Sequence, residues 1–220
     1  MIPVLMTAAA ALALWFWLMP ARASASGLSG QGGWLRSFVK TLSVALLAVV
    51  ALLSGGTGWL VAALSLGALG DFFLSRPSER AFKAGVFAFL AGHLAYLAVF
   101  WPQLQGLAFG PQIVAHGALV VICILMLRAL WQPAQGMRLP ITLYVAVSCA
   151  LGLAAAALPW PHGGQVAAVM FIASDMLLAA GLFGLIGDDG WRRRADRAVW
   201  PLYWGAQALF LASFGFQIPL

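Results

Sequence analysis

Long apolar stretches recur along the whole chain and constrain its fold more than any other feature. Of the 220 residues, 63% are hydrophobic and only 8% are charged. A single soluble core of this size cannot bury so much apolar surface, because most of it would remain in contact with water. A helix of about 20 apolar residues crosses the roughly 30 Å hydrocarbon core of a bilayer. We therefore interpret the stretches as membrane spans.

The stretches divide the chain into eight predicted helices with short connections. We expect an all-α membrane protein whose eight-helix transmembrane bundle forms a single transmembrane domain over residues 1–220. The second span is short, and Lys40 can extend from it toward the membrane surface. The expected helices cover residues 2–19, 38–54, 57–75, 84–101, 112–131, 139–158, 164–184 and 199–218.

The basic residues predict the orientation of these helices, since cytoplasmic loops collect Lys and Arg. All 12 fall within or close beside one set of alternate connections, whereas the opposite connections and both chain ends carry none. Both termini are therefore expected on the non-cytoplasmic side. The net charge of +6 then reflects topology, and its spread over four short loops argues against nucleic-acid binding. The basic residues are Arg22, Arg36, Lys40, Arg76, Arg80, Lys83, Arg128, Arg138, Arg192, Arg193, Arg194 and Arg197.

The N-terminal segment MIPVLMTAAAALALWFWLMPARASA has the apolar run and small residues of a signal peptide but lacks a positive n-region. We expect an uncleaved first helix in a multi-pass integral membrane protein, with the bacterial inner membrane as its location. Cys123 and Cys149 both fall inside apolar helices, where we interpret them as small packing residues.

Two aspartates, Asp71 and Asp175, lie within the expected spans. An ionisable group in a membrane helix costs a few kcal/mol on insertion scales, so it marks a functional site or a buried partner. Counting inward from the nearest basic residue at about 1.5 Å per residue, Asp71 lies about 8 Å into the membrane. The depth of Asp175 depends on whether its helix ends near Gly181 or continues to Gly187.

Other polar residues are expected at similar depths. By the same count, Tyr144 and Tyr203 lie about 9 Å in and Lys40 about 6 Å in, in one layer with Asp71. Each has a simpler interpretation too, as a residue of ordinary interhelical hydrogen bonds or, for Lys40, as a topogenic charge. A deeper layer, about 15 Å in, contains His93, Ser148 and Gln207.

The fourth span carries one specified helix face. Phe82, Gly85, Phe89, His93 and Tyr96 follow one another at intervals of 3, 4, 4 and 3 residues. Residues at these spacings share one stripe of an α-helix.

Five segments together resemble a known family: GDFFL (70–74), FKAGVFAFLAGHLAY (82–96), PITLYVAVS (140–148), FIASDMLLA (171–179) and YWGAQ (203–207). Their order and hydropathy are similar to those of the YhhN-like integral membrane lysoplasmalogenases. Members of that family carry G-D-x-x-L, F-x-x-G-x-x-x-F-x-x-x-H-x-x-Y, S-D and Y-x-x-A-Q motifs. The resemblance covers the second to eighth helices. One departure is Lys40-Thr41, where the family often has Lys-Pro.

The resemblance implies hydrolysis of the vinyl ether bond of lysoplasmalogen, a lysophospholipid, to a fatty aldehyde and a glycerophospho-alcohol. It implies Asp71 and Asp175 as the catalytic residues and no cofactor. We expect no metal site, because the layer contains one His and the chain lacks H-x-x-x-H or E-x-x-H sets. The implied supporting residues are Lys40, His93, Tyr96, Tyr144, Ser148, Ser174, Tyr203 and Gln207.

The chemistry of two carboxyl groups supports this reaction independently of the resemblance. Vinyl ethers cleave by protonation of an alkene carbon, and a carboxylic acid among apolar helices retains its proton nearer neutral pH because desolvation disfavours the charged form. A second, ionised carboxylate can stabilise the resulting cation and take a proton from water. The sequence does not distinguish which aspartate is the acid.

Two other classes of function stay open at this point. A proton-coupled transporter also uses intramembrane carboxylates, and a lipid-binding scaffold needs no chemistry at all. A related enzyme acting on a different ether or ester lipid is a third alternative. Headgroup preference, the route of lipid entry and the oligomeric state are likewise open.

Overall fold

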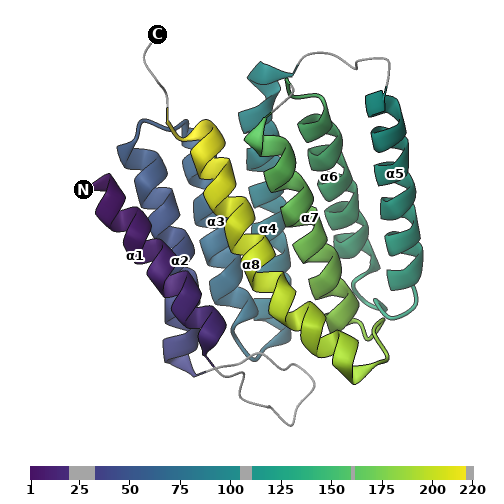
Figure 1. Cartoon of the computed structure of the whole chain (residues 1–220). Coiled ribbons are helices and arrows are strands. Elements are labelled where there is room, and N and C mark those ends of the chain that lie inside the picture. The colour runs from purple at the N-terminus through teal and green to yellow at the C-terminus, as the bar shows by residue number, and fades with distance from the viewer. Residues whose placement is uncertain (20–32, 105–110, 160–161, 217–220) are drawn as a thin grey trace. The chain divides into compact units, whose positions relative to one another are not determined.

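The computed structural model describes residues 1–19, 33–104, 111–159 and 162–216. In that part all regular secondary structure is helical, joined by turns and loops, and there is no strand (Figure 1). The all-α prediction is therefore confirmed. The elements are α1 (Ile2–Leu18), α2 (Trp34–Leu53), α3 (Gly58–Leu74), α4 (Glu79–Phe100), the short 3-10 helix η1 (Trp101–Gln103), α5 (Pro111–Leu130), α6 (Arg138–Ala156), α7 (Gly163–Leu182) and α8 (Asp189–Phe214).

The starts of two helices correct the boundaries expected from hydropathy. α8 begins at Asp189 instead of residue 199, and α4 begins at Glu79 instead of residue 84. At α8, the Asp188 carboxylate accepts the backbone N–H of Trp191 at 2.7 Å, which caps the helix. Residues 189–198, which lie between two of the expected helices, are therefore helical. Hydropathy marks the apolar part of a helix and misses polar turns added before it.

The end of α7 decides the depth of Asp175. The helix ends at Leu182, and Gly184 follows with a φ of +69°. Glycine adopts this left-handed conformation without the steric cost of a side chain, which suits a helix end. Of the two alternatives from sequence, the shorter helix is correct, and Asp175 lies about 10 Å from the end of α7.

Two compact units make up the structure, Met1–Ala95 with Phe214–Leu220 and Tyr96–Ser213. In the first unit, α2 packs against both α1 and α3 (Figure 1). In the second unit, α6 packs against both α5 and α7. The single transmembrane domain stays a prediction.

Arg36 joins α1 to α2 within the first unit. Its Nη1 donates to the backbone oxygens of Met19 at 2.8 Å and Phe16 at 3.2 Å. These carbonyls belong to the end of α1, where no further helical N–H is available to them. The positive charge also complements the negative end of the helix dipole.

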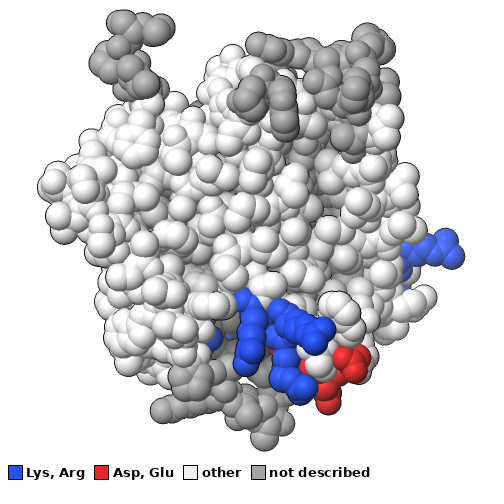
Figure 2. Space-filling view, viewed as in Figure 1, with Lys and Arg blue, Asp and Glu red and all other residues white. Residues whose placement is uncertain are grey.

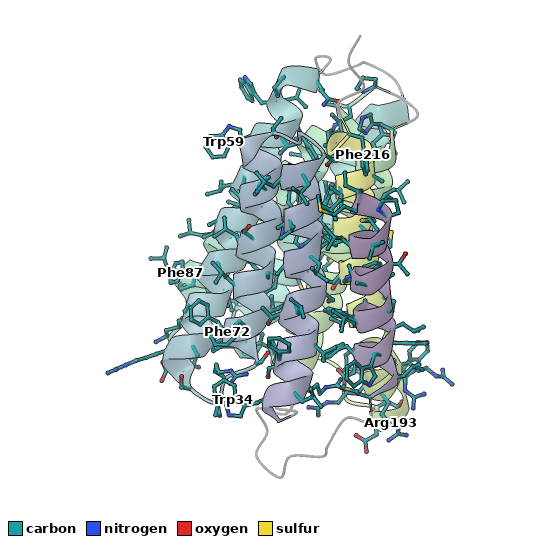
Figure 3. All side chains as sticks on the ribbon, turned by 90° about the vertical axis from the view of Figure 1, so that its left-hand side faces the viewer. Trp34, Trp59, Phe72, Phe87, Arg193 and Phe216 are labelled. Atoms are coloured by element: carbon teal, nitrogen blue, oxygen red, sulfur yellow. The ribbon has the colours of Figure 1, made fainter. Side chains whose placement is uncertain are left out.

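Four helices are long and apolar enough to cross a membrane. They are Trp34–Leu53, Glu79–Gln103, Arg138–Ala156 and Gly163–Leu182. Ile2–Leu18 and Gly58–Leu74 are apolar but shorter, with 17 residues each, and α5 is apolar along the part His116–Leu130. Phe72 and Phe87 extend from the ribbon on exposed faces (Figure 3). Exposed aromatic side chains of this kind suit contact with lipid.

His162 caps the start of α7. Its Nδ1 accepts the backbone N–H of Gly164 at 3.0 Å, and the Gln165 side-chain oxygen accepts the N–H of His162 at 3.3 Å. Burial lowers the pKa of His162 from its ordinary value of 6.5. The folded state therefore favours the neutral imidazole, which the cap requires because a protonated Nδ1 cannot accept.

We expect His162→Ala to destabilise the protein by about 0.5–2 kcal/mol above neutral pH, the usual cost of a lost cap. The penalty should shrink at pH 5. Protonation of Nδ1 removes the cap, so the stability that the cap contributes is fully present above the ordinary pKa of 6.5 and decreases as the pH falls below it. Thermal unfolding in detergent at pH 5 and pH 8 measures this. His162→Asn, which caps without titrating, is the control, and a penalty equal at both pH values contradicts the prediction.

Candidate active site

A buried ion pair joins α2 to α3 in the first unit. Asp71 is only 1% exposed, and its Oδ1 lies 2.7 Å from Nζ of Lys40. The Lys40 ammonium also lies 6.0 Å from the centre of the Phe16 ring of α1. A carboxylate removed from water in this way needs a nearby cation, because desolvation of an isolated charge is costly. Lys40 supplies that cation.

The stripe predicted on α4 packs against α3 in the same unit. A side chain on Gly70 would place its Cβ 2.6 Å from the Phe89 ring, and one on Gly85 would place its Cβ 2.8 Å from the Leu74 side chain. The two glycines therefore allow α3 and α4 to approach closely. Gly70 directly precedes Asp71, so the close approach occurs beside the buried carboxylate.

His93 lies on the same stripe, one turn after Phe89. The side chain is fully buried, and its Nδ1 lies 2.8 Å from the Phe89 backbone oxygen. A carbonyl oxygen only accepts, so Nδ1 carries the hydrogen in this bond. In the neutral ring Nε2 then carries a lone pair, which can accept a hydrogen bond.

The second aspartate is held by a tyrosine within the second unit. The Tyr144 hydroxyl of α6 donates to Oδ2 of Asp175 on α7 at 2.9 Å, and both side chains are partly buried. The neighbouring Ser174 Oγ donates to the Val199 backbone oxygen at 3.0 Å and ties α7 to α8. Within the S-D dipeptide, Ser174 therefore bonds to the backbone of α8, and Asp175 accepts from Tyr144.

Tyr96 and Gln207 form a third pair, again within the second unit. Both are fully buried, and the Tyr96 hydroxyl donates to Oε1 of Gln207. The Tyr96 ring lies 4.1 Å from that of Phe210 and 6.0 Å from that of Phe171, centre to centre. Since Tyr96 occupies the amide oxygen, the Gln207 amide presents its N–H donors, for which the described residues offer no acceptor.

Tyr203 and Ser148 are the remaining expected site residues. Tyr203 is buried, with its ring 5.7 Å from that of Phe171. Ser148 is also buried, and in the part of the chain that the structure describes its Oγ has no hydrogen-bond partner. The same part contains no group of three or more His, Cys, Asp or Glu arranged to hold a metal.

The structure therefore resolves the expected residues into pairs. Lys40 forms an ion pair with Asp71, Tyr144 donates a hydrogen bond to Asp175, and Tyr96 donates one to Gln207. Sequence reasoning placed Lys40 and Asp71 in one layer without pairing them. It also missed Phe171, whose ring contacts those of Tyr96 and Tyr203. Phe171 lies four residues before Asp175, and this helical spacing could have indicated that both side chains lie on one face of α7.

We expect Lys40→Met to be strongly destabilising, up to about 3–5 kcal/mol, because it leaves a buried carboxylate without its cation. Asp71→Leu should cost less, since the Lys40 side chain is 22% exposed and can turn toward water. The double variant should recover most of the loss. Thermal unfolding in detergent of the wild-type protein, the two single variants and the double variant gives a double-mutant cycle. Losses of stability that simply add would contradict the coupling between Lys40 and Asp71.

Comparisons with known proteins place these residues in a family context. The YhhN family model matches residues 35–214. Proteins of Mycobacterium bovis and Mycobacterium tuberculosis, both named "Lysoplasmalogenase", are 32% identical to this chain over 169 residues. The match covers 72% of this chain and 60% of each relative, so the chain spans less than two thirds of their length.

No solved structure matches the chain. The family match nevertheless includes every predicted site residue, from Lys40 to Gln207. Four helices of the structure have the length and composition of membrane spans. The chain is a membrane protein that belongs to the YhhN family.

Proposed function

We propose that this protein hydrolyses the vinyl ether bond of lysoplasmalogens and releases a fatty aldehyde and a glycerophospho-alcohol. The observation that carries the proposal is the Lys40–Asp71 ion pair, a buried charged group inside apolar helices. The names of the two mycobacterial relatives supply the substrate class.

The reaction begins with a proton. An acid protonates the alkene carbon two bonds from the ether oxygen, and the positive charge is shared between that oxygen and the adjacent carbon as an oxocarbenium ion. Water adds to this carbon and loses a proton to a base, which gives a hemiacetal. The hemiacetal then breaks its bond to the glycerol oxygen, which takes up a proton, and the aldehyde remains. The site must therefore supply a proton donor and an anionic acceptor.

We assign the anionic role to Asp71. The Lys40 ammonium, 2.7 Å away, stabilises the ionised carboxylate electrostatically. An ionised group can stabilise the oxocarbenium ion and accept the proton of water, but it cannot serve as the initial acid.

The initial acid is then Asp175. The Tyr144 hydroxyl donates to Oδ2 of Asp175 and fixes the orientation of the carboxyl group, and we place the acidic proton on Oδ1. Two carboxyl groups in different surroundings can hold different protonation states at one pH, which acid–base catalysis requires.

The supporting residues bind oxygen atoms in this scheme. His93 and Gln207 present a ring nitrogen lone pair and amide N–H groups that suit water or a glycerol hydroxyl. Tyr96 orients the Gln207 amide, and Ser148 and Tyr203 supply further hydroxyls. Basic side chains at the expected cytoplasmic ends of the helices bind the lipid phosphate, and the Lys40 ammonium pairs with Asp71.

We also propose that all eight helices lie in the bilayer with both termini on the non-cytoplasmic side, in a bacterial inner membrane. The placement of the 12 basic residues supports this orientation. Ile2–Leu18 and Gly58–Leu74 have 17 residues each, so local thinning of the bilayer or snorkelling of flanking residues must make up their length.

The first activity prediction concerns the two aspartates as one catalytic unit. Purified protein should release aldehyde from a vinyl ether lysophospholipid. Asp71→Asn and Asp175→Asn should each reduce the rate by roughly 10²–10⁴, the contribution typical of a lost general acid or base. The double variant should be little worse than the poorer single one, because both groups serve one reaction. The rate should follow a bell-shaped pH profile.

The control is Asp189→Asn, an exposed aspartate at the start of α8. Near-normal turnover in a folded Asp71 or Asp175 variant removes that residue from the chemistry. If neither wild-type protein nor variants release aldehyde but proteoliposomes show proton-coupled flux, the protein is a transporter.

The second activity prediction concerns Lys40. If it sets the charge of Asp71, Lys40→Ala should lower kcat and shift the pH dependence of the rate while KM changes little. Lys40→Arg, which retains the cation, should recover much of the rate. If Lys40 instead binds the lipid phosphate, KM should rise with kcat nearly unchanged, as expected for lost uniform binding.

A further inference from the structure

The junction of α7 and α8 contains a hollow of about 570 Å³, within the size range of small-molecule sites. Leu177 of α7, Ile186 and Asp188 of the connection, and Trp191, Arg194 and Ala198 of α8 all line it. The three α8 residues recur at intervals of three and four, so they share one face of that helix. The small side chain of Ala198 leaves room between α8 and α7.

This hollow is separate from the candidate active site. Leu177 follows Asp175 by two positions, which is about 200° around a helix. The two side chains therefore leave α7 on opposite sides. Asp175 is not among the residues that line the hollow.

The position of the hollow along α7 suits the headgroup region of a bilayer. α7 has the length and composition of a membrane span and ends at Leu182. Just beyond that end, Leu185 and Trp191 are 39% and 64% exposed. Apolar and tryptophan side chains at a helix end are typical of the membrane interface. A hollow at this depth is therefore accessible to the lipids of the bilayer.

The hollow offers one cation and one anion that do not pair with each other. The Arg194 guanidinium lies 5.3 Å from the centre of the Trp191 ring and is exposed. The Asp188 carboxylate accepts the backbone N–H of Trp191 and so stays at the start of α8. Among the described residues, ion pairs within 4.0 Å involve neither side chain. Figure 2 shows basic and acidic side chains next to one another where α8 begins.

We propose that the hollow binds the headgroup of a bilayer phospholipid with phosphoethanolamine chemistry. The phosphate lies on Arg194 and the ammonium on Asp188, in charge-assisted hydrogen bonds. The glycerol and the first methylenes lie against Leu177, Ile186 and Ala198. This site goes beyond the proposed hydrolysis, since its occupant is a lipid that is not turned over.

The two charges select among headgroups. A phosphoglycerol headgroup pairs with Arg194 but has no cation for Asp188. A phosphocholine headgroup has a quaternary ammonium that cannot donate a hydrogen bond, and Arg194 already occupies a position near the Trp191 ring. Phosphoethanolamine alone of the three satisfies both charges with donors and acceptors.

The experiment compares thermal unfolding of detergent-purified protein with added diacyl phosphatidylethanolamine, phosphatidylglycerol or phosphatidylcholine. Wild-type protein should gain most from phosphatidylethanolamine, because a ligand that binds only the folded state raises its melting temperature. Native mass spectrometry titrations give the apparent affinities. Neither measurement requires turnover, so the result does not depend on whether the protein releases aldehyde.

Matched variants separate the site from general surface charge. Arg194→Gln should weaken phosphatidylethanolamine binding roughly tenfold, the loss of one charge-assisted contact. Arg193→Gln makes the same change of charge at an exposed neighbour that does not line the hollow and extends away from α8 (Figure 3), and it should have little effect. Asp188→Asn retains the cap, since Asn and Asp cap equally well. It should abolish the preference for phosphatidylethanolamine over phosphatidylglycerol, whereas Asp189→Asn should not.

Ala198→Phe tests the hollow without changing any charge, and it should also weaken phosphatidylethanolamine binding. Equal losses in Arg193→Gln and Arg194→Gln would overturn the proposal in favour of unspecific attraction. Equal gains from all three lipids, or the largest gain from phosphatidylglycerol, would overturn it as well. So would an unchanged affinity in both Arg194→Gln and Ala198→Phe.

Discussion

The cost of placing a charge among apolar helices governs the arrangement of the first unit. Asp71 is 1% exposed, and Lys40 lies 2.7 Å away on the neighbouring helix. Since a buried carboxylate without a cation costs several kcal/mol, α2 and α3 must pack in the one register that joins these two side chains. Gly70 then allows the Phe89 ring of α4 to lie against α3 beside the ion pair. One electrostatic requirement thus fixes how three helices meet.

In the second unit, hydroxyl groups donate to several of the described polar side chains and backbone oxygens. Tyr144 donates to Asp175, Ser174 to a backbone oxygen of α8, and Tyr96 to Gln207. Such bonds hold a side chain in one orientation without adding a compensating charge. Asp71 and Asp175 therefore have different surroundings, one beside an ammonium and one beside a phenol. This difference is the physical basis for giving them different roles in acid–base chemistry.

The ends of the helices show how the chain moves from apolar to aqueous surroundings. Arg36 donates to the last carbonyls of α1, His162 caps α7, and Asp188 caps α8. Each bond satisfies a backbone group that the helix itself leaves unpaired. At the start of α8 the capping carboxylate also lines a hollow, opposite an arginine. A group that stabilises a helix end is thereby available to a lipid headgroup.

The sequence by itself determined the all-helical class, because apolar runs of this length leave few alternatives to helices in a bilayer. It also indicated the stripe of α4 and which polar residues to consider for a candidate site, since helical spacing and intramembrane charge are visible in one dimension. It did not determine the polar first turns of α4 and α8, which hydropathy does not register.

Only the tertiary structure decided which polar groups pair. Depth along a helix placed Lys40, Asp71, Tyr144 and Tyr203 in one layer, but depth is a single coordinate. The rotation of each helix about its axis selects Lys40 for Asp71, and that rotation follows from packing between residues distant in sequence, such as Gly70 against Phe89. For the same reason the sequence listed Lys40 among the supporting residues without naming its partner, and the structure shows that its ammonium lies 2.7 Å from the carboxylate of Asp71.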